Sequence, residues 1–232
     1  MIFRSPFSKK IVIGLGRKKD SVSIFKKKYE FISNPVRKQI LELRKKFSSK
    51  FNINKINILI IGGSQGANIL GENIPEALNL LPKEIKNKII VHHQCSKNNI
   101  ETIKKKYSKM KLRFNCKVFF NNLPYLMSNS NLVISRAGAS SLSEISSLGK
   151  TSILIPYKYA KNNHQSANAE WFKKHGASEI INEEDFSIIK LHDTIKNLLN
   201  NYKKLEKMSK NSFLLSDKNC LKKLANLILK IK

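Results

Sequence analysis

The chain has 232 residues, of which 41% are hydrophobic and 26% charged, and these proportions exclude extensive disorder and a membrane-embedded protein. A chain of this length can bury roughly 70% of its unfolded surface, enough for one α/β domain or two small ones. The 44 basic and 16 acidic residues give a net charge of +28, which predicts attraction to polyanions. However, lysine is spread along the whole chain, which favours a bias in amino-acid composition over selection for an anionic partner.

Cysteines and hydropathy indicate a reducing compartment. Cys95, Cys116 and Cys220 are far apart and contain no CxxC pair, so neither a disulfide framework nor a zinc site is expected. The apolar run KIVIGLG is too short for a signal sequence, and no run approaches the length of a membrane span. We expect a cytoplasmic protein whose membrane contact is peripheral.

Residues 1–36 differ from the rest of the chain. KIVIGLG predicts a strand without a neighbouring βαβ unit, and NPVRKQILEL at 34–43 predicts a turn that opens a helix, with Pro35 near its start. We expect this segment to be the remnant of another domain and its connection.

From Lys55 onward, short β-branched runs alternate with longer helical patterns, which is typical of βαβ units on a parallel sheet. The predicted strands are 56–61, 88–93, 117–120, 132–135, 152–155 and 179–181. The predicted helices are 67–81, 98–110, 123–128, 140–148, 164–174 and 191–209. We therefore predict an α/β fold, a Rossmann-like doubly wound parallel sheet over 37–215, followed by an amphipathic helix in 216–232.

The strongest local motif is a glycine-rich turn, GGSQGA at 62–67, between a buried strand and a helix. Its glycines allow close backbone approach, Ser64 offers a hydroxyl, and the free amides of a helix N-terminus favour a phosphate. Neither a GxGxxG fingerprint nor a GxxxxGK[ST] loop is present. Two alternatives stay open: a turn that only packs helix against strand, and a hydrolase nucleophile elbow with Ser64, Glu144 and His164 as a triad.

A second cluster, SRAGASSLSE at 135–144, follows another buried strand. In a parallel sheet both turns lie at the carboxyl ends of strands, where open α/β folds bind ligands. Gly138, Ala139 and Ser140 can present amides to a phosphate, and the two oxygens of Glu144 can accept both hydroxyls of a ribose. The alternative is that Glu144 only stabilises the start of a helix.

A third cluster is the polar loop KNNHQSANA at 161–169. The side-chain amide of Gln165 both donates and accepts, which suits recognition of sugar hydroxyls. His164 could act beside it, although a lone histidine is more often structural or exposed.

These clusters, in this order, resemble glycosyltransferase family 28, GT-B enzymes that add N-acetylglucosamine to lipid I. The resemblance covers roughly residues 30 to 180 and rests on NPVR, GGSQGA, HHQCSK, VFFNNLPYL, SRAGASSLSE and PYKYAKNNHQSANA. Ser96 and Asn68 depart from the family pattern. The resemblance implies that the diphosphate contacts Ser64, Gln65 and Gly66, with Arg37 nearby. It also implies that the Phe120 backbone holds the uracil and that Glu144 binds the ribose. The nucleotide cleft would be lined by Arg136, Gly138, Ala139 and Ser140, and the N-acetylglucosamine would be bound by His164 and Gln165.

The resemblance also implies a reaction. N-acetylglucosamine passes with inversion from UDP-N-acetylglucosamine to lipid I, forming lipid II at the cytoplasmic face of the bacterial inner membrane, without a cofactor or a metal. The family's acceptor-binding N-terminal domain, which should supply the general base, is largely missing from this chain. We therefore expect a donor-binding half whose partners are UDP-N-acetylglucosamine, lipid I through an acceptor domain, and the anionic membrane surface.

Three alternatives remain. The chain could be the donor-binding subunit of a split transferase that works with a separate N-terminal-domain polypeptide. It could be a polyanion-binding protein, although basic and aromatic residues do not interleave as in nucleic-acid modules, so no nucleic acid is expected. The serine hydrolase is the third.

Overall fold

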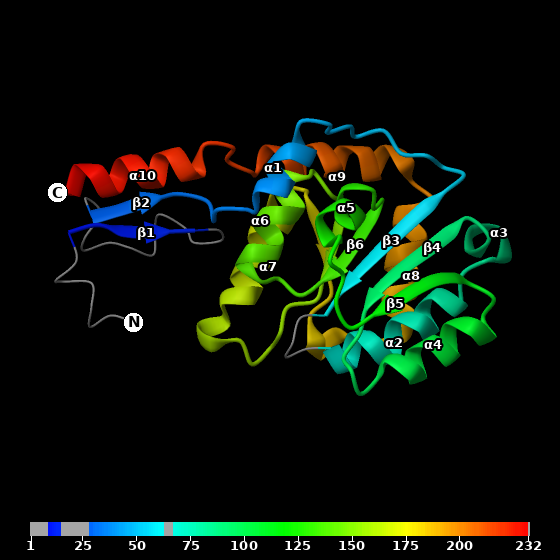
Figure 1. Cartoon of the computed structure of the whole chain (residues 1–232). Coiled ribbons are helices and arrows are strands. Elements are labelled where there is room, and N and C mark those ends of the chain that lie inside the picture. The colour runs from blue at the N-terminus through cyan, green and yellow to red at the C-terminus, as the bar shows by residue number, and fades with distance from the viewer. Residues whose placement is uncertain (1–8, 15–27, 63–66, 232) are drawn as a thin grey trace.

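The structure is a computed structural model that describes residues 9–14, 28–62 and 67–231, and Figure 1 shows the arrangement of its elements. Its centre is a six-stranded sheet in which every pair of neighbours is parallel. The strands are β3 (Ile56–Ile61), β4 (Ile89–Gln94), β5 (Arg113–Lys117), β6 (Leu132–Ser135), β7 (Ser152–Leu154) and β8 (Ser178–Ile180). Their order, β5-β4-β3-β6-β7-β8, is that of a doubly wound Rossmann-like sheet, so the predicted fold class is confirmed.

Both faces of the sheet are covered, because the central strands β3 and β6 carry apolar side chains that point to either side. Along β3, Ile58 and Ile60 face one core cluster and Leu59 faces the other, and all three are fully buried. The first cluster is completed by α2 (Ala67–Asn79), α4 (Ile100–Lys109), α8 (Ile188–Leu199) and α9 (Tyr202–Leu214). The second is completed by α1 (Lys38–Arg44), α5 (Leu123–Ser128), α6 (Ala139–Ser147) and α7 (His164–Lys174). Burial of each such side chain stabilises the fold by roughly 1.5 to 3 kcal/mol.

The predicted strand at 117–120 is wrong. The edge strand β5 lies earlier, at Arg113–Lys117, and pairs with Ile90–Gln94 of β4. An edge strand needs less apolar sequence than a central one, so RFNCK gives a weak signal. Two residues of the apolar run that attracted the prediction are exposed instead: Val118 is 46% and Phe119 is 65% accessible.

The predicted helix at 191–209 is two helices, α8 and α9. Ser187 caps the first by accepting a hydrogen bond from the Lys190 amide at 3.1 Å, and Asn201 caps the second by accepting one from the Lys204 amide at 2.9 Å. A side-chain cap at Asn201 satisfies an amide that a continuous helix would bond to its own carbonyls.

The short helix α3 (Lys83–Lys86) was not predicted. The predicted bounds of β3, β6, α5 and α7 match the structure residue for residue.

The N-terminal segment and the C-terminal helix adjoin each other. β1 (Ile11–Ile13) does have a partner, since it pairs in parallel with β2 (Tyr29–Phe31) in a separate two-stranded sheet. The helix α10 (Cys220–Ile231) begins against the chain that follows β2, where the buried Cys220 Sγ lies 3.9 Å from the Asn34 carbonyl oxygen. Among the residues described, no helix is long and apolar enough to cross a membrane.

Candidate functional site

The carboxyl ends of β3 and β6 form the switch point of the sheet. These two strands are hydrogen-bonded neighbours, with Ile61 opposite Ser135, yet β4 lies on the far side of β3 and β7 on the far side of β6. In open α/β folds, ligands bind at such a switch point, beside the carboxyl ends of the strands. Both predicted clusters begin there. Gly62 is buried at the end of β3, whereas Ser64, Gln65 and Gly66 lie outside the described residues.

Arg37 and Glu144 meet at this edge, although they are 107 residues apart in the sequence. The Arg37 Nε and Nη2 atoms each donate to a different oxygen of Glu144, both at 2.7 Å. This hydrogen bond raises the pKa of Arg37 above its usual value. The Glu144 side chain is 14% accessible and that of Arg37 is 48% accessible, so a half-exposed cation covers a mostly buried carboxylate. A carboxylate has about four acceptor positions, so Glu144 can still accept hydrogen bonds from a ligand.

The start of α6 presents backbone donors at the same edge of the sheet. Gly138 is the N-cap residue with φ −67° and ψ 137°, and no side chain caps the helix. Nothing lies within 4 Å of the position that a Gly138 Cβ would take, so the space beside it is open. Uncapped amides at Ala139 and Ser140 together with the helix dipole form an anion-binding terminus.

Arg136 is held inside the protein. Its Nη2 atom lies 2.6 Å from Glu183 Oε1, its Nη1 atom donates to the Ile155 carbonyl at 3.0 Å, and the residue is 9% accessible. Glu183 also accepts a hydrogen bond from the Lys158 amide at 3.1 Å. This arrangement ties together the chain segments that follow β6, β7 and β8. Glu183 is a site residue that the sequence motifs do not indicate, since its one signal is its place just beyond the carboxyl end of β8.

The loop before α7 places Gln165 and His164 differently. The Gln165 Oε1 atom accepts a hydrogen bond from the Tyr157 amide at 3.1 Å, so its amide nitrogen is the end available to donate to a ligand. His164 is exposed, and its Nδ1 atom lies 2.6 Å from the Lys161 carbonyl oxygen. Asn168, buried in the same helix, donates to the Ala137 carbonyl at 3.1 Å and so fixes α7 against the turn after β6.

Phe120 lies beyond the end of β5 and is 2% accessible. Its ring meets that of His92 edge to face, with centroids 6.4 Å apart, and its carbonyl oxygen accepts a hydrogen bond from the Leu123 amide at 3.2 Å. Burial lowers the pKa of His92, with a smaller effect from the charge of Lys55, so His92 is neutral at pH 7. A buried ring that anchors this turn holds the backbone of Phe120 in place.

The arrangement does not support the serine hydrolase. A triad needs the carboxylate to accept a hydrogen bond from the histidine Nδ1 atom. Here both oxygens of Glu144 are bonded to Arg37, and His164 Nδ1 faces a carbonyl oxygen. Within the described ranges there is also no group of His, Cys, Asp or Glu residues that could hold a metal ion.

A doubly wound parallel sheet with an open helix terminus and a carboxylate at its switch point defines a Rossmann-like α/β domain with a candidate ligand site at that edge. Residues 57–226 match the glycosyltransferase family 28 C-terminal domain, and the chain belongs to this family.

Individual proteins that are similar to this chain come from one branch of the family. Two curated proteins, from Wigglesworthia glossinidia brevipalpis and Zymomonas mobilis, are both named UDP-N-acetylglucosamine--N-acetylmuramyl-(pentapeptide) pyrophosphoryl-undecaprenol N-acetylglucosamine transferase. The first is 38% identical over 85% of this chain and 55% of its own length, and the second is 37% identical over 75% and 45%. The crystal structure of Acinetobacter baumannii MurG has the same fold, with a TM-score of 0.79 and 24% identity over 97% of this chain and 62% of that one. The chain spans about half the length of the curated relatives it matches.

Proposed function

We propose that this chain binds UDP-N-acetylglucosamine and supplies the donor half of an inverting transferase that converts lipid I into lipid II. The names of its relatives support the substrate and the reaction. The observation that carries the proposal is the position of Glu144 and Arg37 at the switch point, beside the open start of α6. A nucleoside diphosphate needs a hydrogen-bond acceptor for its ribose and cationic or amide donors for its phosphates, and this edge offers both.

Each part of the donor is proposed to meet a separate element. The diphosphate is held by Arg37, by the turn at 62–66 and by the amides of Gly138, Ala139 and Ser140. Glu144 accepts the ribose hydroxyls, and the backbone at Phe120 meets the uracil edge. Gln165 donates to the sugar, with His164 beside it. Arg136 lines the nucleotide cleft and holds the chain segments around it in place.

The proposed chemistry develops negative charge on the leaving diphosphate. The acceptor hydroxyl attacks the anomeric carbon of the sugar, the bond to the phosphate oxygen breaks, and UDP leaves with the electron pair. Preorganised donors aimed at that developing charge lower the barrier, which is the role we assign to Arg37 and to the N-terminus of α6. We propose that the acceptor, its general base and therefore transfer itself require the acceptor-binding half.

The proposed organisation follows the fold. Residues 37–215 form the donor domain, residues 1–36 connect it to the acceptor half, and residues 216–232 form the C-terminal helix. We propose that the enzyme works at the cytoplasmic face of the inner membrane as a peripheral protein.

Calorimetry with UDP, UDP-N-acetylglucosamine and ATP tests the proposal. We expect both uridine nucleotides to bind in the micromolar to millimolar range that is typical of substrates, at about 1 μM to 1 mM, and ATP to bind more weakly. Equal affinity for ATP and for uridine nucleotides would contradict the assignment of a donor site. Absence of uridine nucleotide binding by a folded chain would contradict it as well.

A split transferase is the second candidate, because the chain matches only 45% to 55% of the length of its relatives. In that case an acceptor-domain polypeptide supplied separately restores transfer of labelled sugar to lipid I, while neither polypeptide transfers it alone. Transfer by the 232-residue chain alone would exclude both this candidate and the requirement for an acceptor half.

A further inference from the structure

A second cavity lies on the edge of the sheet opposite to the donor site. It has a volume of about 480 Å³ and lies between the loop that joins α1 to β3, the turn that joins α5 to β6, and Lys150. Asn57 is at the start of β3, Asn131 directly precedes β6, and Lys150 precedes β7, so all three mark amino ends of parallel strands. We call it the amino-edge cavity. Its volume falls within the roughly 300 to 1,000 Å³ of small-molecule sites.

The floor of the amino-edge cavity is a fixed network of asparagines. The Asn57 amide donates to Asn131 Oδ1 at 2.7 Å, and Asn57 Nδ2 donates to the Asn129 carbonyl oxygen at 3.1 Å. Asn129 Nδ2 in turn donates to the Tyr125 carbonyl oxygen at 2.9 Å. These bonds hold the turn before β6 against the start of β3, so the cavity keeps its shape without a ligand.

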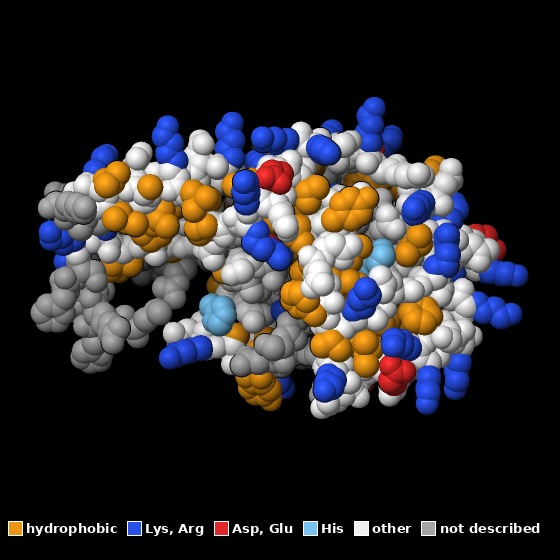
Figure 2. All heavy atoms as spheres, viewed as in Figure 1, with side chains coloured by type: hydrophobic (Ala, Val, Ile, Leu, Met, Phe, Trp, Pro, Cys, Tyr) orange, Lys and Arg blue, Asp and Glu red, His pale blue; other side chains and the backbone are white. Residues whose placement is uncertain are grey.

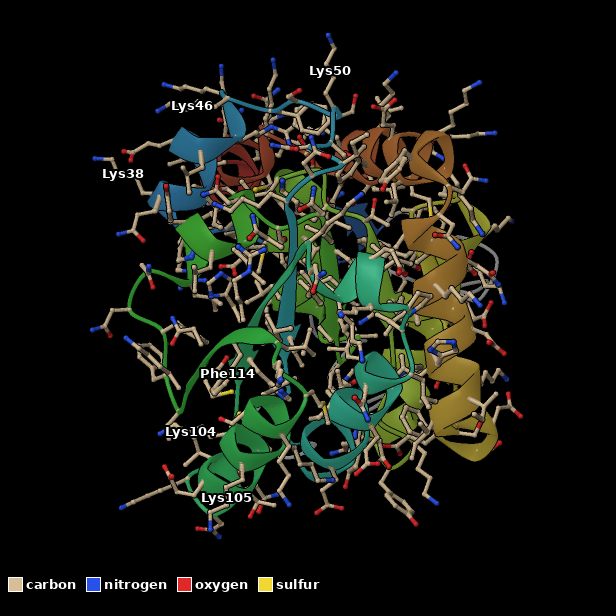
Figure 3. The ribbon with its side chains drawn as sticks, turned by 90° about the vertical axis from the view of Figure 1, so that its right-hand side faces the viewer. Lys38, Lys46, Lys50, Lys104, Lys105 and Phe114 are labelled. Carbon is tan, nitrogen blue, oxygen red and sulfur yellow. The ribbon has the colours of Figure 1, made fainter. Side chains whose placement is uncertain are left out.

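The described lining of the cavity is basic and contains no acidic residue. Lys46, Lys50, Lys55 and Lys150 contribute four ammonium groups. Figure 3 shows Lys46 and Lys50 at the top of the view, extending outward from the loop that forms the rim. Because lysine is abundant throughout this chain, the number of lysines does not mark a site by itself.

Lys150 distinguishes this cavity from an ordinary lysine-rich surface. It is only partly accessible, and its Nζ atom donates to the Ser128 carbonyl oxygen at 2.5 Å. Among the described residues no carboxylate lies within ion-pair distance of it. Burial lowers the pKa of Lys150 to about 8. An enclosed ammonium with one neutral acceptor is stabilised when an anion enters beside it.

We propose that the amino-edge cavity binds a phosphate group, carried either by a small phosphorylated molecule or by an anionic lipid headgroup, with Lys150 as its inner contact. Lys46, Lys50 and Lys55 then close over the anion from the rim. The site is distinct from the donor site, because the two lie at opposite ends of the parallel strands.

To test the proposal, the 232-residue chain is first saturated with UDP. It is then titrated with inorganic phosphate or with pyrophosphate while backbone-amide NMR spectra are recorded. We expect saturable shifts at Asn57, Asn131 and Lys150, and a dissociation constant about tenfold higher in Lys150→Met, because a hydrogen bond to a charged group is lost. Lys105→Gln is the matched control, since Figure 3 shows Lys105 at the opposite end of the molecule from Lys50. This control should leave the constant within about twofold of the wild-type value.

A second arm identifies the source of the phosphate. Binding to phosphatidylglycerol vesicles, measured by flotation against phosphatidylcholine vesicles, should fall in Lys150→Met if the ligand is a headgroup and stay unchanged if it is soluble. The rim variant Lys46→Gln/Lys50→Gln provides the same test if Lys150→Met does not fold. The proposal is overturned if neither soluble phosphate nor vesicle binding depends on these lysines, or if Lys105→Gln weakens binding as much as they do.

Discussion

At the scale of single residues, Glu144 has two possible roles, as a ligand for ribose or as the partner that holds Arg37. The geometry allows both, because Arg37 approaches from one side and leaves acceptor positions free. Arg37 is 48% accessible, and an ion pair exposed to that degree contributes roughly 0 to 1 kcal/mol to stability. The two roles therefore make different predictions when the carboxylate is removed.

Glu144→Ala should weaken UDP binding by about ten- to a hundredfold, the equivalent of about 1.5 to 3 kcal/mol for hydrogen bonds to a charged acceptor. The free energy of unfolding should change by less than about 1 kcal/mol. Calorimetry and urea denaturation measure the two quantities. Glu84→Ala, an exposed carboxylate on α3, is the matched control. Loss of stability with unchanged affinity in the folded fraction would assign Glu144 to structure alone.

Lys150 gives the stability a predictable pH dependence. Its pKa of about 8 in the folded protein is below the ordinary lysine value of 10.5, so between these values the unfolded chain holds a proton that the folded chain does not. Folded-state stability therefore rises with pH across this window, by up to about 3 kcal/mol from this residue. Lys150→Met should be more stable than wild type at pH 7 and nearly equal to it at pH 10.5, in urea denaturation. A difference that does not change with pH would show that Lys150 keeps its ordinary pKa.

At the scale of elements, the turn after α6 depends on glycine at 149. Gly149 has φ +59°, and a Cβ at this position would collide with the ring of Phe47, which stacks on Phe213 at 3.9 Å between centroids. Gly149→Ala should cost about 2 kcal/mol or more of unfolding free energy, since neither the backbone nor the stacked rings can give way cheaply.

Gly138→Ala is the control for this change, because Gly138 has an ordinary φ of −67° and open space beside it. Its unfolding free energy should stay within about 0.5 kcal/mol of the wild-type value. If both substitutions cost the same in thermal or urea denaturation, the strain assigned to Gly149 is wrong.

The helix α10 presents an apolar stripe to solvent. Leu221, Ile228 and Leu229 are 50%, 57% and 65% accessible, and Figure 2 shows apolar side chains gathered on this helix with Lys or Arg side chains along its edges. An interfacial helix of this kind inserts its apolar face while each Lys near an anionic surface adds about 1 kcal/mol.

Deletion of the residues after Asp217 should therefore weaken salt-sensitive binding to phosphatidylglycerol vesicles, measured by co-sedimentation. Lys105→Gln, which leaves the helix intact, should have little effect. Binding that survives the deletion unchanged would assign the attraction to charge spread over the whole surface.

The strands and helices differ in how far sequence determines them. The predicted bounds of β3 and β6 match the structure because central strands covered on both faces give nearly continuous apolar runs, INILII and LVIS. β5 is an edge strand with one exposed side, and the break between α8 and α9 depends on a single cap at Asn201, so neither leaves a strong pattern. β1 was recognised as a strand, but its pairing with β2 depends on chain geometry that no local pattern records.

At the scale of the whole molecule, the candidate site could be predicted in part. The ends of β3 and β6 could be placed at one edge, because each motif directly follows a buried strand and the two strands are parallel neighbours. The contact between Arg37 and Glu144 could not be predicted, because it depends on how α1 packs on α6. That between Arg136 and Glu183 depends on the order of β6, β7 and β8. The roles assigned to Ser64, Gln65 and Gly66 stay predictions, since these residues lie outside the described part of the chain.

The central claim is that the carboxyl edge of the sheet is a UDP-N-acetylglucosamine site. An NMR titration of the 232-residue chain with UDP-N-acetylglucosamine tests it most directly, because backbone amides report which edge the ligand occupies. We predict saturable shifts at Phe120, Gly138 and Tyr157, with Asn57 and Asn131 unmoved. Shifts confined to Asn57 and Asn131, or no shifts in a folded chain at millimolar ligand, would contradict it.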